Sequence, residues 1–224
     1  MKKLSLLIGG LLFSGLMMAQ TGEQKGMITI EGQTNIGGVV IGEKLAPSLR
    51  FRYFATEKIA LRGTFGMRNT NETSTFTSLP NNAGSTGTYM EKSNAWNVAI
   101  GAEYHVAGTE KLSPYVAVDF VYGGGKRIID GENANATAYQ ANYMRDAELP
   151  LKRIGAAVMA GADYNFSSAF YLGAEVGFQV SKLTVGPGEA TTTSNGNTTT
   201  STTIEKVYGS ATDMIAAVRL GFRF

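Results

Sequence analysis

The chain has 224 residues, and its 20 basic and 18 acidic side chains nearly balance, so no basic surface for nucleic acid is expected. Cysteine is absent, which excludes disulfide bonds and a lipid-modified cysteine. With 28 glycines and 17% charged residues, the composition suits strands in lipid better than a solvated surface, and the length suits one domain.

Residues 1–19 have the layout of a secretory signal peptide. Lys2 and Lys3 precede an apolar run from Leu4 to Met18, and Ala19 supplies the small residue before a polar sequence. A membrane anchor is the alternative, but the run has about 15 residues and a spanning helix needs about 20. We expect cleavage after Ala19. Loss of the two lysines lowers the formal charge of the mature domain, residues 20–224, from +2 to zero.

Eight later segments alternate apolar and polar residues with the two-residue period of a β-strand. They are residues 27–35, 45–55, 59–68, 94–106, 113–122, 154–164, 170–180 and 211–224. Each has the length of a tilted strand that crosses a bilayer. The pattern predicts an all-β fold, an eight-stranded antiparallel up-and-down barrel that spans a membrane.

The connections between these segments alternate between short and long. The short ones are residues 55–58, 107–112 and 165–168, and the long ones are 36–44, 69–93, 123–153 and 181–206. Short connections require antiparallel hairpins, so the long segments share one end of the barrel. The Thr-rich tract at 191–203 should be mobile unless it binds a partner or paired strand extensions flank it.

Alternation alone also fits a soluble, lipocalin-like barrel with its apolar face inward. The charges decide between the two, because the apolar face of every strand is uncharged and the strands hold almost no lysine. A soluble exterior would be rich in charge and lysine. An arginine facing lipid at mid-depth would cost about 2–4 kcal/mol, so the charged face should line the interior.

An eight-stranded barrel encloses only enough room for side chains, so charges inside it must pair. We therefore expect an ion-pair network that plugs the lumen, with simple solvation of these charges as the alternative. The expected members are Glu31, Arg50, Arg52, Arg62, Arg68, Glu103, Asp119, Asp163, Glu175 and Arg219, with Asp213 on the same face. Aromatic residues near strand ends on the apolar face predict a girdle: Tyr53, Trp96, Tyr104, Tyr122, Phe170, Phe222 and Phe224.

The last strand ends on Phe222 and Phe224, with Arg219 and Arg223 between its apolar positions. This tail resembles the C-terminal strand of Gram-negative outer-membrane β-barrels, and the whole chain resembles small barrels of the OmpA and OmpX type. The resemblance implies an outer-membrane, cell-surface monomer surrounded by lipid and lipopolysaccharide, with periplasmic turns and extracellular loops. It also implies that Phe222 and Phe224 are an assembly signal for the barrel assembly machinery. No second domain is expected.

The only histidine, His105, lies near Glu103 at the end of the fourth strand, beside a short turn. Outer-membrane hydrolases and acyltransferases of similar architecture work from the opposite rim, so we interpret His105 as a network member and not a general base. Gly123 to Lys126 lacks phosphate-loop spacing, and no His or Cys cluster has metal spacing. We expect no catalytic residue, cofactor or metal.

Three functions stay open at this point. The first is a non-enzymatic surface protein, structural or adhesive, whose long loops bind an extracellular ligand. The second is a narrow, porin-like pore for solute or ions, controlled by Arg50, Arg52, Arg62, Arg219 and their carboxylate partners. The third, least favoured, is a lipid-modifying enzyme that uses His105.

Overall fold

The computed structural model describes residues 25–38, 46–78, 84–106, 108–203 and 206–224, which form ten β-strands and their connections. The strands are β1 (Ile28–Gly38), β2 (Ala46–Phe54), β3 (Ile59–Thr77), β4 (Thr86–His105), β5 (Leu112–Ala134), β6 (Tyr139–Asn165), β7 (Phe170–Val185), β8 (Gly188–Ser194), β9 (Asn197–Thr203) and β10 (Lys206–Arg223). Within these ranges, no helix has the length and apolar character needed to cross a membrane. The predicted signal peptide at 1–19 lies outside the described residues.

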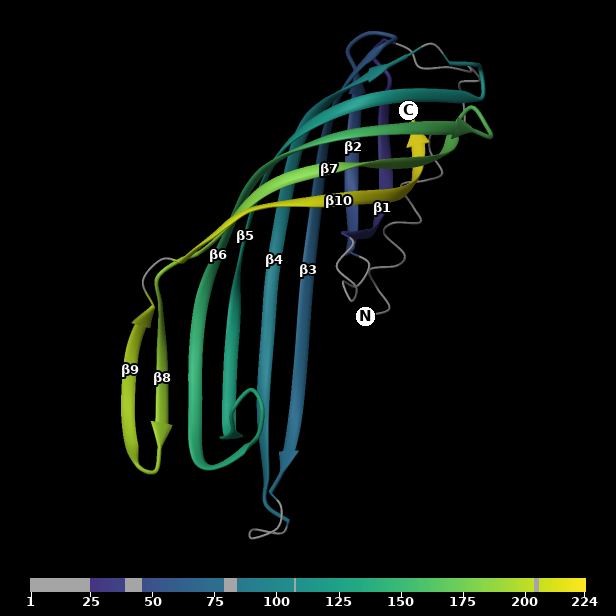
Figure 1. Ribbon diagram of the computed structural model, residues 1–224. Coiled ribbons are helices and arrows are strands. Elements are labelled where there is room, and N and C mark those ends of the chain that lie inside the picture. The colour runs from purple at the N-terminus through teal and green to yellow at the C-terminus, as the bar shows by residue number, and fades with distance from the viewer. Residues whose placement is uncertain (1–24, 39–45, 79–83, 107, 204–205) are drawn as a thin grey trace.

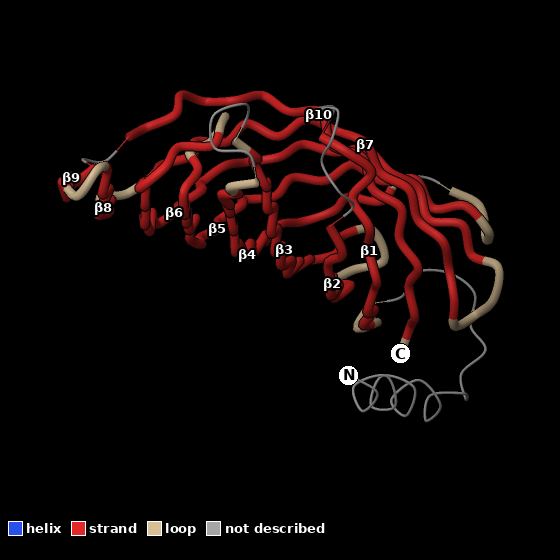
Figure 2. Tube along the Cα trace, turned by 90° about the horizontal axis from the view of Figure 1, so that it is seen from below, coloured by secondary structure: helices blue, strands red, loops and turns tan. Residues whose placement is uncertain are grey.

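Eight of the ten strands form a closed antiparallel ring, which confirms the predicted fold class. Hydrogen-bonded neighbours follow the order β1 to β7 and then β10, and pairing of β1 with β10 closes the ring. In Figure 2 the strands from β6 round to β1 stand side by side along a curved wall. Closure leaves the two terminal strands without the exposed edge that an open sheet would give them.

The four central strands are longer than predicted and extend well past the rest of the ring (Figure 1). The register between β3 and β4 runs unbroken from Ile59 opposite Tyr104 to Thr77 opposite Thr86. Strands β5 and β6 pair as far as Ala134 opposite Tyr139, with one register shift between Glu132 and Ala134. Most of the segments 69–93 and 123–153, expected as loops, is therefore paired strand. Sequence alternation missed the extensions because neither of their faces is uniformly apolar, so the two-residue period fades.

The Thr-rich tract forms a hairpin of β8 and β9, which is the paired alternative and not the mobile one. Its two-residue turn, Asn195-Gly196, has positive φ at both positions, 51° and 81°, as a tight β-hairpin requires. Strand β8 also pairs with β6, from Tyr143 opposite Ser194 to Glu148 opposite Glu189. Threonine is β-branched and favours strands, so low complexity did not prevent local order.

The two faces of the ring have opposite character, as the positions of the charges predicted. Large apolar side chains point outward and are exposed, for example Ile100 at 65% and Phe178 at 62%. Charged side chains point inward and are buried, for example Arg52 at 1%. This arrangement is the inverse of a soluble barrel and leaves an apolar belt around the molecule.

Most of the predicted girdle is on this outer face, but Phe222 is an exception. Tyr53, Trp96, Tyr104, Tyr122 and Phe224 are exposed, and Phe170 is half-buried. The ring of Phe222 is only 5% exposed, because it packs between Phe170 and Phe224 with centroid distances of 4.9 and 4.6 Å. Phe222 therefore fixes the end of β10 against β7 and contributes little to the outer surface.

Candidate functional site

A network of buried ion pairs fills the middle of the barrel, and every strand of the ring supplies at least one member. The members are Glu31 on β1, Arg50 and Arg52 on β2, Arg62 on β3, Glu103 on β4, Asp119 on β5, Asp163 on β6, Glu175 on β7 and Arg219 on β10. None of these residues is more than 6% exposed. We call this set the lumen plug. The tenth residue expected here, Arg68, lies farther along β3, where it lines the cavity described below.

At the end of the plug nearer the short turns, which we call its lower end, four side chains form a closed ring of ion pairs. Glu31 contacts Arg52 Nε with one oxygen at 2.5 Å and Arg219 Nη1 with the other at 2.9 Å. Asp163 bridges the same two guanidinium groups, at 2.8 Å to Arg52 and 2.7 Å to Arg219. Arg52 also contacts Glu103 at 2.9 Å. Glu31 and Asp163 therefore each neutralise charge from two strands, β2 and β10.

Two bidentate arginine–carboxylate pairs form the upper end of the plug, which is the end nearer the strand extensions. Arg62 donates to both oxygens of Asp119, at 2.6 and 2.8 Å, and Arg50 donates to both oxygens of Glu175, at 2.7 and 2.9 Å. Arg62 Nη1 also reaches Glu103 at 3.0 Å, which connects the two ends. Planar fork-to-fork geometry of this kind gives the strongest arginine–carboxylate contacts.

Two tyrosines that the sequence analysis did not assign to the network complete it. Tyr115 donates a hydrogen bond to Glu175 at 2.9 Å and accepts one from Arg219. Tyr171 donates to Glu31 at 2.5 Å. Tyr115 on β5 and Tyr171 on β7 alternate in step with the inward charged residues of the same strands. This spacing was the feature of the sequence that could have indicated that they point into the lumen. Their partners lie on other strands, which alternation does not reveal.

Glycines opposite these rings leave room for them. A Cβ added at Gly221 would come within 2.0 Å of the Tyr171 ring, and one added at Gly161 would come within 2.3 Å of the Tyr115 hydroxyl. Neither distance is possible for a real side chain. Each glycine lies directly opposite its tyrosine on the neighbouring strand, so its missing side chain leaves the space that the ring occupies.

His105 takes part in a hydrogen-bonded chain at the short-turn end. Its Nδ1 lies 2.8 Å from Ser113 Oγ, and its Nε2 lies 3.2 Å from Glu103 Oε2. The order Ser–His–Glu is that of a catalytic triad, but the ring nitrogens are reversed, because a triad serine contacts Nε2 and the carboxylate contacts Nδ1. All three are also at most 4% exposed, and the rings of Phe54 and Tyr115 lie against the imidazole at centroid distances of 5.2 and 5.3 Å. A substrate has no room to approach Ser113.

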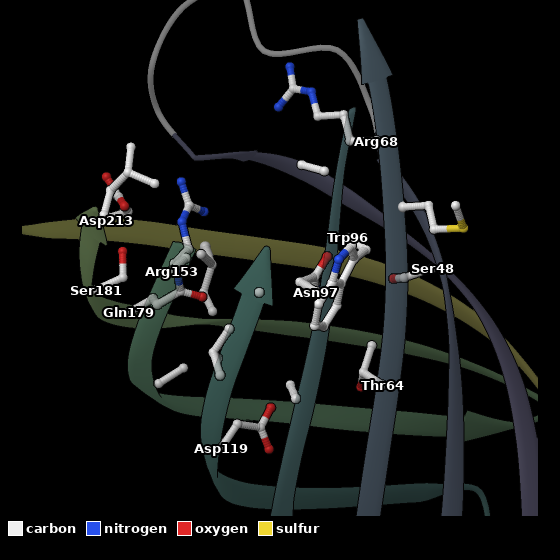
Figure 3. Close-up of a pocket in the computed structure, with 18 of the residues that line it drawn as sticks. Ser48, Thr64, Arg68, Trp96, Asn97, Asp119, Arg153, Gln179, Ser181 and Asp213 are labelled. Atoms are coloured by element: carbon white, nitrogen blue, oxygen red, sulfur yellow. The ribbon is translucent and has the colours of Figure 1, made fainter. Parts of the chain in front are cut away.

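Above the plug, toward the strand extensions, the lumen contains a cavity of about 770 Å³ (Figure 3). This corrects the expectation that an eight-stranded interior holds side chains and nothing else. The reason is the small size of the inward residues at this level, among them Ser48, Ala99, Ala157 and Ala217. Arg68 and Asp213, both expected inside, line this cavity. In the sequence, the feature that could have indicated this cavity was the presence of small residues at the inward-facing positions of the strands.

Comparison with known proteins gives one family and several structures of similar fold. Residues 43–181 match the model of the OmpA-OmpF-like porin family. No curated protein sequence matches the chain. A major outer membrane protein from Thermus thermophilus is similar in structure, with a TM-score of 0.57, 11% identity and coverage of 88% of this chain and 99% of that one. That likeness supports the barrel fold.

Two further structures match with lower TM-scores. The N-terminal β-barrel domain of Pseudomonas aeruginosa OprF has a TM-score of 0.37 at 15% identity, covering 92% of this chain and 100% of that one. Ail, the attachment invasion locus protein of Yersinia pestis, has a TM-score of 0.38 at 13% identity, covering 88% and 95%. The family match spans more than half of the chain, and the ring carries the outward apolar belt of a membrane barrel. The chain therefore belongs to the OmpA-OmpF-like porin family, and it is a β-barrel of the Gram-negative outer membrane.

Proposed function

We propose that the protein is a non-enzymatic surface protein whose barrel is a closed anchor and whose strand extensions form the working surface. The observation that carries this proposal is the lumen plug, in which four arginines and five carboxylates from all eight ring strands form ion pairs with one another. A continuous water path would have to pass through these contacts.

The energy of the plug supports closure over conduction. Removal of one partner from a buried ion pair costs about 3–5 kcal/mol, since the other charge stays in a medium of low dielectric constant. A pore opened by rotation of Arg50 and Arg62 would separate both from Glu175 and Asp119 at once. Such an opening is rare unless new partners replace the lost ones.

The strand extensions support the surface role because they have a small core of their own. Ile129, Ala147 and Ala190, on β5, β6 and β8, are buried together, and Tyr89 packs against them. This packing makes the extension an ordered sheet with fixed side-chain positions. Its outer side carries exposed groups such as Met144 at 61%. We propose that this sheet faces outward from the cell and contacts an extracellular ligand.

The test of closure is planar-bilayer conductance of the purified, refolded protein. The proposal expects no steady channel activity from the wild type and transient openings from Arg62→Met. Steady wild-type openings that disappear when plug charges are changed would instead support the second candidate, a narrow solute pore. That candidate is favoured by the cavity above the plug, which already occupies part of the path.

The surface role has a separate test, a loop exchange. Replacement of residues 188–203 by a short turn removes the β8–β9 hairpin and leaves the plug intact. Reduced attachment of whole cells to host surfaces or to other cells, with unchanged amounts of protein in the outer membrane, is the expected result. Unchanged attachment would count against this hairpin as a contact surface.

The remaining partners are proposals as well. Lipid and lipopolysaccharide would surround the apolar belt of a monomer. The barrel assembly machinery would recognise the C-terminal strand through Phe222 and Phe224. The backbone of Phe224 donates a hydrogen bond to Ile28 of β1 at 2.9 Å, which supports a role of the terminal residue in closing the ring. Export by a signal peptide at 1–19 would precede these steps.

A further inference from the structure

The cavity above the plug has a floor of charged residues that are already satisfied. Arg50 and Asp119 line it, but Arg50 is paired with Glu175, and Asp119 is paired with Arg62. Each of these contacts is bidentate. A charged ligand would have to compete with them, so the floor offers little attraction to ions of either sign.

The walls between the floor and the extensions carry neutral hydrogen-bonding groups, together with three basic side chains (Arg68, Lys152 and Arg153) and three acidic ones (Glu72, Glu91 and Asp213), whose formal charges balance. Ser48 on β2 and Asn97 on β4 line one side, and Gln179 and Ser181 on β7 line another, as Figure 3 shows. Ser48 is 9% exposed, and its Oγ has no hydrogen-bond partner among the residues that the structure describes. A buried hydroxyl without a partner costs about 1–3 kcal/mol, so a guest molecule with its own hydroxyl groups would be stabilised there.

A third part of the wall is apolar. Met159 and Ala157 on β6 are buried in one cluster, Ile215 on β10 packs against it, and all three line the cavity beside Val121. Hydroxyl and amide groups on some strands and methyl groups on others give an amphipathic site. Small-molecule sites commonly combine an apolar wall with a few placed polar groups, in volumes of roughly 300–1,000 Å³.

We propose that this cavity binds the end of a neutral carbohydrate, one or two sugar units long. A sugar ring presents hydroxyl groups along its edge and C–H groups on its face, which match the two kinds of wall. Its lack of charge matches the satisfied floor. The inference rests on the proposed closure of the lumen, because only a closed floor makes the cavity a binding site and not a segment of a channel.

The test uses the full mature chain, refolded in lauryldimethylamine oxide so that no sugar-based detergent is present. Saturation-transfer NMR with a panel of neutral disaccharides (maltose, cellobiose, lactose and diacetylchitobiose) detects a soluble source. A second arm uses neutral oligosaccharides released from the outer sugar chain of lipopolysaccharide, because neutral sugars attached to a lipid present the same groups. Binding in either arm is expected, and the arm that binds identifies the source.

The variants Asn97→Leu and Gln179→Met remove hydrogen-bonding groups with little change in volume, and each should weaken binding at least tenfold. Asn94→Leu is the matched control, since Asn94 lies on the outer face of the same strand and is exposed. It should bind as the wild type does. Heat-modifiable gel mobility verifies that each variant is folded.

Absence of binding in both arms would overturn the proposal, and so would binding that survives both cavity variants. Conductance of the same preparation is measured separately. A protein that conducts steadily contradicts closure of the lumen. A protein that is closed but binds no sugar contradicts this inference alone.

Discussion

Substitution of Arg62 by methionine is the perturbation that the structure predicts most sharply. Arg62 is 2% exposed and forms ion pairs with three carboxylates. These carboxylates differ in whether they keep another arginine partner once Arg62 is removed. Glu103 keeps Arg52, and Glu175 keeps Arg50. Asp119 loses both contacts of a bidentate pair, at 2.6 and 2.8 Å, and is left as a buried charge. The expected loss of unfolding free energy is about 3–5 kcal/mol.

A second substitution, Asp119→Asn, should reverse part of that loss. It removes the charge that Arg62→Met leaves unpaired. The double variant should therefore lose about 0.5–3 kcal/mol less unfolding free energy than the sum of the losses of the two single variants. The assay is urea unfolding in phospholipid vesicles, followed by the fluorescence of the chain's single tryptophan, Trp96. Lys126→Met is the control, because its pair with Glu148 is exposed and should be worth about 0–1 kcal/mol.

The reasoning is wrong if Arg62→Met stays within about 1 kcal/mol of the Lys126→Met control, since buried and exposed pairs would then be equivalent. It also fails if the two plug substitutions are additive. Additivity would mean that Asp119 does not depend on Arg62 for its burial.

Three further outcomes follow from the same structure. His105→Ala should leave the lipid composition of cells unchanged, measured by mass spectrometry, because Ser113 is sealed from substrate; altered acylation would support an enzyme. Gly221→Ala should lower stability by about 1–3 kcal/mol in vesicle unfolding, since its Cβ would overlap the Tyr171 ring, whereas Gly63→Ala, with nothing within 4 Å, should cost about 0.5 kcal/mol or less. Equal losses would refute the packing argument. Gly196→Val should open the β8–β9 turn to limited proteolysis without loss of heat-modifiable mobility, because its φ of 81° disfavours a β-branched residue. A variant as resistant as the wild type would contradict the turn geometry.

The ring could be predicted from sequence because the bilayer imposes a strict rule on each strand. Residues such as Ile100 and Phe178 must face lipid, so their neighbours Gly101 and Gln179 must face inward, and the alternation is visible without a structure. The same rule sent nine of the ten proposed charges into the plug. Parity therefore gives the direction of a side chain, which was enough for the fold, but it did not single out Tyr115 and Tyr171 or separate Arg68 from the plug.

The alternation of residues along a strand does not show which inward side chains form ion pairs with one another. Arg62 meets Asp119 two strands away, and Arg50 meets Glu175 across the lumen, because the tilt and stagger of the barrel decide which inward residues share a level. The strand extensions were missed for a different reason. Outside the membrane no rule separates their two faces, so Thr77 and Thr86 carried no pattern even though they are paired. The cavity depends on the volumes of the inward side chains that share one level of the barrel. The stagger of the strands decides which residues those are, so the sequence alone does not show the cavity.

The most direct measurement of the central claim, that arginine–carboxylate contacts close the lumen, is hydrogen exchange of the arginine side chains. In NMR spectra of the refolded protein, the Nε–H groups of Arg50, Arg52, Arg62 and Arg219 are expected to exchange with solvent at least a hundredfold more slowly than that of the exposed Arg153. Exchange of all five at the rate of an exposed arginine would show a hydrated lumen and contradict the account.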